Sequence, residues 1–155
     1  RAGRRGVFRT RRSPAVNLAG SLVRADDGAV VVERLLAADT FATRWLGLQF
    51  RSSLDVRSGL LLVPCGSIHT ACMRFAIDAA FLDVRGRVVE VRRGVRPWRV
   101  VVPAAPAHAC LETAAGMLDA LAPGVRLRLV APADAVMRPA LRFLIDVVAG
   151  SRDSG

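Results

Sequence analysis

Residues 65–83, which read CGSIHTACMRFAIDAAFLD, carry the strongest structural signal in the chain. They place a histidine, an arginine, two cysteines and two acids inside an otherwise apolar run. Burying a polar group without a partner is costly, so each of these side chains needs a partner inside the fold or access to a ligand. The stretch therefore predicts either a binding site or a polar link that holds the fold together.

Strands are predicted on both sides of this stretch. Residues 30–36 (VVVERLL) are rich in β-branched side chains, and residues 59–63 and 68–75 lack polar alternation, which is typical of central strands. Residues 81–84 and 88–91 flank Arg85 and Gly86 and predict a hairpin, with Asp83 as a turn residue. Residues 98–102 and 125–130 bring the set to about seven short strands.

Short helices are expected at the edge of these strands. Asp39 is a candidate N-cap for a helix with Phe41 and Trp45 on one face, and residues 113–121 suit a second short helix. A third helix begins near Asp134 and carries an apolar stripe that includes Met137. The predicted fold is mainly β: a compact β-sandwich or partly closed barrel with two edge helices and a C-terminal helix.

The composition indicates a single domain with a basic N-terminal arm. The chain has 155 residues, of which 52% are hydrophobic, and a net charge of +10. All 23 basic residues are arginine, which indicates GC-rich coding and weakens the arginines as a sign of a partner. Residues 1–12 alone supply +6 and contain no acid, so the rest of the chain is only mildly basic.

We accordingly divide the chain into three parts. Residues 1–28 are predicted to be a basic, disordered arm, residues 29–131 a β-rich domain, and residues 132–155 an amphipathic helix and tail. Weak, salt-dependent association with nucleic acid or an anionic membrane would come from the arm.

The cysteine count bears on localisation. Cys65, Cys72 and Cys110 make an odd number, so reduced thiols are the simpler interpretation, and this slightly favours the cytoplasm. No stretch reaches the roughly 18 apolar residues that span a bilayer, and no continuous signal-peptide core follows the arginines. The chain does not begin with Met, so an envelope location stays open if the N-terminus is incomplete.

A set of short motifs spread over residues 30–130 carries a family resemblance. They are Thr43-Arg44, Gly47-Leu48, Gly59-Leu60-Leu61-Leu62, Cys65, Ile68-His69-Thr70, Met73-Arg74-Phe75, Ile77-Asp78, Phe81-Leu82-Asp83, Leu111-Glu112, Gly116 and Gly124. In order and spacing they resemble the bacterial and archaeal family called domain of unknown function 192. The resemblance implies a compact, mainly β domain with no established reaction and no catalytic residues to carry over. Cys72 and Val125 depart from the family pattern, where a small residue and an acid are usual.

Cys65 and His69 form the first candidate site. Residues four apart on an extended strand face the same side, where His69 would deprotonate the Cys65 thiol to make a nucleophile. However, Pro64 and Gly66 make the backbone irregular, and a cysteine in an apolar run is more often a small buried hydrophobe.

A metal site is a weaker alternative. It would collect Cys65 and His69 with Cys72, Cys110 and His108, which are ligand types that zinc favours. Their spacing is not a standard zinc pattern. We therefore assign no metal ligand and no cofactor.

Arg74 and Asp78 form the third candidate group. A carboxylate among apolar residues needs partners when it is buried, and Arg74 or a backbone turn would supply them. In that interpretation Asp78 stabilises the fold. The alternative is that His69, Arg74 and Asp78, with Cys65, converge at the mouth of a cleft and bind a small ligand.

Residues 92–99 form a basic loop that contains Trp98. Arginines interleaved with an aromatic residue can stack on nucleic-acid bases, but one tryptophan is thin support. We expect Trp98 to pack into the sheet and the arginines to be solvated.

These observations favour a non-enzymatic module that binds a ligand or a protein partner. Two alternatives stay open. One is a thiol- or metal-dependent enzyme centred on Cys65 and His69, and the other is a protein that associates with nucleic acid or an anionic membrane through its arm.

Overall fold

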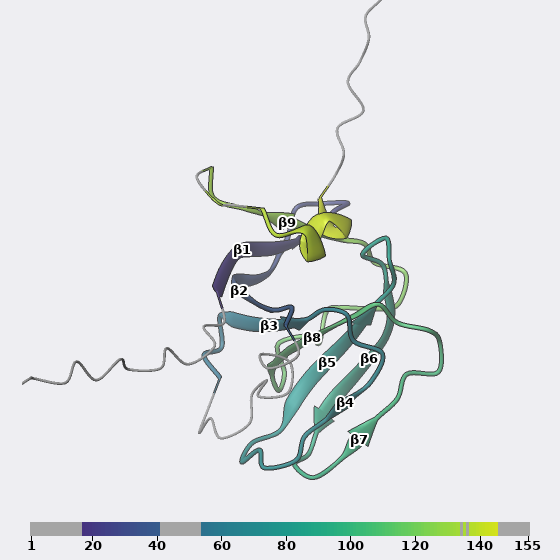
Figure 1. Ribbon diagram of the computed structural model, residues 1–155. Coiled ribbons are helices and arrows are strands. Elements are labelled where there is room, and N and C mark those ends of the chain that lie inside the picture. The colour runs from purple at the N-terminus through teal and green to yellow at the C-terminus, as the bar shows by residue number, and fades with distance from the viewer. Residues whose placement is uncertain (1–16, 41–53, 134, 136, 146–155) are drawn as a thin grey trace, which may run out of the picture.

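The computed structural model describes residues 17–40, 54–133, 135 and 137–145. The regular secondary structure of this part of the chain is almost entirely β-strand, which confirms the predicted mainly β class (Figure 1). The elements are β1 (Asn17–Arg24), β2 (Val30–Ala38), β3 (Ser58–Leu62), β4 (Ile68–His69), β5 (Ile77–Leu82), β6 (Val88–Val95), β7 (Val100–Val101), β8 (Ala109–Ala114), β9 (Leu127–Val130) and the 3-10 helix η1 (Pro139–Leu144). No helix in the described part is long and apolar enough to cross a membrane.

Seven strands form one open sheet in the order β6-β5-β8-β3-β2-β1-β9, and β4 pairs with β7 in a separate two-stranded sheet. Neighbours in the large sheet are antiparallel except β2 and β3, which run parallel with Leu36 beside Leu60. Every residue of β3 and β5 is buried, because side chains cover both faces. The prediction that residues 59–63 form a central strand is therefore confirmed.

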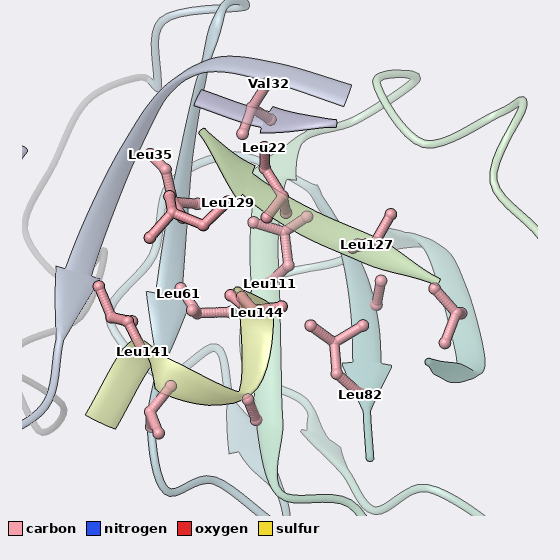
Figure 2. Close-up of a cluster of buried hydrophobic side chains, with 14 of the residues drawn as sticks. Leu22, Val32, Leu35, Leu61, Leu82, Leu111, Leu127, Leu129, Leu141 and Leu144 are labelled. Carbon is pink, nitrogen blue, oxygen red and sulfur yellow. The ribbon is translucent and has the colours of Figure 1, made fainter. Parts of the chain in front are cut away.

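One face of the large sheet carries the larger core. Leucines from six strands meet there, and Leu141 and Leu144 of η1 lie across them (Figure 2). Both η1 leucines are only 1% exposed. The short helix η1 thus contributes to the fold by covering this core and excluding solvent from it.

The opposite face carries a second core. It is built on Leu60, Leu62, Phe81 and Cys110, and Ile68 belongs to the same cluster. The β4–β7 sheet contributes Ile68 directly and Val101 as a partly buried neighbour. The inner side of β4–β7 therefore packs on the large sheet, which leaves its other side facing outward.

The predicted hairpin around Arg85 and Gly86 is confirmed. The carboxylate of Asp83 accepts hydrogen bonds from the backbone N–H groups of Arg85 (2.7 Å) and Arg87 (2.9 Å), and Gly86 adopts a φ of 74°. Left-handed φ values are easily adopted by glycine, so the turn chemistry fits the sequence.

Three predictions about secondary structure were wrong. Residues 68–75 are not one long strand, because only Ile68–His69 is extended before a turn with Cys72 at a φ of 61°. Residues 113–121 are not a helix: β8 runs to Ala114 and turns follow. Residues 17–24, which we placed in the arm, form β1.

The predicted C-terminal helix is reduced to η1. Residues before proline favour extended backbone, and Arg138, before Pro139, has a ψ of 130°. Ile145 is extended as well, so the helix is confined between the two. The helix predicted after Asp39 falls within residues 41–53, outside the described residues.

Candidate functional site

Asp78 is a buried hub of backbone hydrogen bonds. One carboxylate oxygen accepts from the Gly94 N–H (2.9 Å), and the other accepts from Gly116 (2.9 Å) and Leu118 (3.1 Å). The residue is 0% exposed. Asp78 thus ties β5 to β6 and to the turns after β8, and these bonds occupy both oxygens.

Arg74 lies away from this hub. It is exposed in the loop between β4 and β5, and it forms no ion pair with any residue in the described ranges. The structure therefore does not bring Arg74 and Asp78 together. The donors that Asp78 needs come from the backbone.

Cys65 and His69 lie on different sides of their segment. The Cys65 thiol donates to the Ser67 carbonyl (3.1 Å), and the side chain packs against the second core. Ile68 also points into that core, so the next residue of the strand, His69, faces the outer side, where it is paired with Val100. This arrangement does not favour a nucleophile and base pair.

The cysteines and histidines do not form a metal-binding group. Within the described residues, no three His, Cys, Asp or Glu side chains are placed to share an ion. Cys110 is fully buried, and burial raises the pKa of its thiol well above the usual value, with smaller contributions from Glu112 and Cys65.

Glu112 is a buried acid that appeared in the sequence only within the family motif Leu111-Glu112. It lies on β8 between Leu60 of β3 and Ala79 of β5 and is 3% exposed. No described residue donates a hydrogen bond to its carboxyl group, and burial raises its pKa to about 8. The signal was present in the run CLETA, but these residues were not recognised as part of a strand.

Thr70 organises the loop that carries Trp98. Its buried hydroxyl donates to the Arg96 carbonyl (2.7 Å) and accepts from the Arg99 N–H (2.9 Å), while its own carbonyl accepts from the Trp98 N–H (2.9 Å). These bonds hold Trp98 at a φ of 61°. The indole is 66% exposed, so the expectation that Trp98 packs into the sheet was wrong.

Two valines continue the apolar surface that begins at Trp98. Val100 and Val102 are 75% and 66% exposed, whereas Val101 between them packs on the second core. Arg96 and Arg99 are exposed beside them. We call the set Trp98, Val100, Val102, Arg96 and Arg99 the Trp98 surface.

Comparison with known proteins agrees with the fold. A model of the uncharacterized family domain of unknown function 192 matches residues 22–129. UPF0127 proteins from Thermococcus sibiricus and Pyrococcus furiosus are 34% and 38% identical, over 64% and 59% of this chain and 67% and 81% of their own. A crystal structure of a protein of unknown function from Novosphingobium aromaticivorans superposes with a TM-score of 0.64 at 21% identity, and the match covers 79% of this chain and 99% of that one. The chain therefore belongs to the family domain of unknown function 192.

Proposed function

We propose that this domain is a non-enzymatic binding module and that the Trp98 surface binds a protein partner. The observation that carries the proposal is the exposed indole of Trp98, held in left-handed backbone by a buried threonine. A residue other than glycine in this conformation costs about 1 to 3 kcal/mol, and such strain is concentrated at functional positions. The fold thus maintains an unfavourable conformation that presents an aromatic side chain to solvent.

The residue types of the Trp98 surface support a protein partner. Tryptophan and arginine are enriched among the residues that dominate binding energy at protein interfaces. Here they lie beside two exposed valines on a short, pinned strand. The apolar area is small, which fits a weak or transient complex.

Two residues of the predicted ligand site remain in this proposal. His69 is paired with Val100 on the outer side of β4–β7, and Arg74 lies in the loop that follows Thr70. Cys65 and Asp78 face the interior, so we leave them out of the binding surface. Residues 1–12, the basis of the nucleic-acid and membrane alternative, lie outside the described residues.

A random peptide library panned on the immobilised protein tests the proposal. We expect enriched peptides to bind the wild type and to bind Trp98→Ser at least about tenfold more weakly, because truncating a central aromatic anchor typically costs more than 1 kcal/mol. Val84→Ser is the matched control, since Val84 is also 66% exposed but lies in the β5–β6 turn. Peptides that bind Trp98→Ser as well as the wild type would refute the proposal.

A further inference from the structure

We infer that the partner segment is an acidic peptide in extended conformation that pairs with the free edge of β7; this inference rests on the proposed function. It follows from three features of the Trp98 surface. One strand edge is unpaired, prolines limit the length of that edge, and the arginines around it have no counter-ion.

The outer edge of β7 is free within the described part of the chain. β7 has β4 as its single neighbour. The Thr70 N–H donates to the Arg99 carbonyl (2.8 Å), and the Arg99 N–H donates to the Thr70 hydroxyl (2.9 Å), so both backbone groups of Arg99 face the segment that contains β4. Because hydrogen-bonded and non-hydrogen-bonded pairs alternate, Val100 directs its backbone N–H and C=O to the opposite edge. These groups are available to an added strand.

Two prolines set the length of this edge. Pro97 precedes Trp98 and Pro103 follows Val102, and neither has a backbone N–H to donate. Trp98 lies outside the extended edge as well, because its backbone is left-handed and its N–H already donates to the Thr70 carbonyl. The free edge therefore lies within residues 99–102. This length suits a short peptide segment and does not suit the addition of a long strand.

The charge around this edge is not neutralised. Arg74, Arg96 and Arg99 are exposed and form no ion pair with a described residue. Arg92 and Arg93 differ, because Arg92 pairs with Glu90 and Arg93 donates to the Leu121 carbonyl (2.6 Å). Arg99 donates one side-chain N–H to the Trp98 carbonyl (3.3 Å), but this bond leaves its charge without a counter-ion. Guanidinium groups without an ion pair favour a partner with carboxylates, which accept charge-assisted hydrogen bonds from arginine.

A peptide satisfies this surface more fully than lipid or nucleic acid does. Nucleic acid would neutralise the arginines but would leave the exposed valines without an apolar partner. Lipid could supply both a charge and an apolar partner, but neither lipid nor nucleic acid has the backbone N–H and C=O groups that pair with a free strand edge. Side chains of an added strand alternate between its two faces. Apolar residues would lie beside Val100 on one face, and acidic residues would meet Arg99 on the other.

Synthetic hexapeptides test this inference directly. We expect Ac-DVEVDV-NH2 to bind the wild type and the basic analogue Ac-KVKVKV-NH2 to bind at least about tenfold more weakly, since the charge at the arginines is reversed. Methylation of single backbone nitrogens should weaken the acidic peptide at alternate positions, because only every second N–H faces β7. Arg99→Gln should weaken binding, whereas Arg142→Gln, an exposed arginine on η1, should not.

The outcomes separate this inference from the proposed function. Peptides from the library that depend on Trp98 but carry no acidic residues and tolerate every N-methylation would overturn the extended acidic partner and leave the binding module standing. Preferential binding of oligo-dT or phosphatidylglycerol vesicles to the same surface, lost in Trp98→Ser, would overturn both. Binding of the acidic hexapeptide with an alternating methylation pattern supports both.

Discussion

Asp78 and Glu112 are both buried acids on neighbouring strands, yet their carboxyl groups differ in the hydrogen bonds that they accept. Asp78 receives three backbone hydrogen bonds, whereas Glu112 receives none from the described residues. They also lie on opposite faces of the sheet: Glu112 is in register with Ala79, the residue after Asp78. The comparison shows that burial alone does not define the role of an acid. The number of hydrogen-bond donors that reach its carboxyl group also defines that role.

The largest effect is expected from Asp78→Ala. The substitution leaves three buried N–H groups without an acceptor, at about 1 to 3 kcal/mol each, so the free energy of unfolding should fall by about 5 kcal/mol. Urea denaturation followed by circular dichroism measures it. If Asp78→Ala does not fold, Asp78→Asn supplies a milder variant that keeps one acceptor oxygen. A loss under about 1 kcal/mol in both variants would show that Asp78 is not the hub described above.

Glu112→Met, which replaces the buried acid with an apolar side chain, is expected to raise the free energy of unfolding. We expect the variant to be more stable than the wild type at pH 9, because the wild type must ionise a carboxyl group in an apolar environment. A pKa near 8 instead of the usual 4.5 corresponds to roughly 4 to 5 kcal/mol.

This difference should depend on pH in a defined direction. Between about pH 4.5 and 8 the unfolded wild type is ionised at Glu112 while the folded protein keeps the proton, so wild-type stability falls as pH rises through this range. Above pH 8 Glu112 is ionised in both states, so wild-type stability does not fall further through this group. Unfolding curves at pH 5, 7 and 9 for wild type and Glu112→Met test this, and a stability difference that is constant with pH would contradict the raised pKa.

A smaller effect is expected from Asp83→Ala. Asp83 accepts two backbone hydrogen bonds in an exposed turn and is itself partly exposed. In the variant, water can therefore accept hydrogen bonds from the two N–H groups that lose the carboxylate. We expect a loss of about 1 to 2 kcal/mol in thermal or urea unfolding. A loss as large as that of Asp78→Ala would contradict the expectation that access to water lowers the cost of removing this carboxylate.

Local patterns predicted the parts of the fold that depend on neighbours in sequence. The apolar run at residues 59–63 indicated a central strand, and Arg85-Gly86 between alternating residues indicated a hairpin. The failures involve distant partners. Residues 113–121 have a helical apolar pattern, but Asp78 accepts the N–H groups of Gly116 and Leu118 from a distant strand, and this fixes turns instead.

The candidate site was harder to predict than the fold. Nothing in the sequences AIDAAF and CLETA distinguishes the acid with three donors from the acid with none, because the donors lie elsewhere in the chain. The exposure of Trp98 depends on Thr70, a residue distant in sequence that directly follows β4 and that appeared in the sequence only within the family motif Ile68-His69-Thr70. The family resemblance located the domain but contained no information on either feature.

The pairing of β1 with β9 has a consequence for synthesis of the protein. β1 and β2 leave the ribosome before β9 and can form a hairpin, but the other edge of β1 is covered only after Leu129 is available to lie beside Leu22. Until then this edge is open to strands of other nascent chains, a situation that promotes aggregation. The speed of translation between these two strands therefore sets how long each new chain is exposed to misassembly.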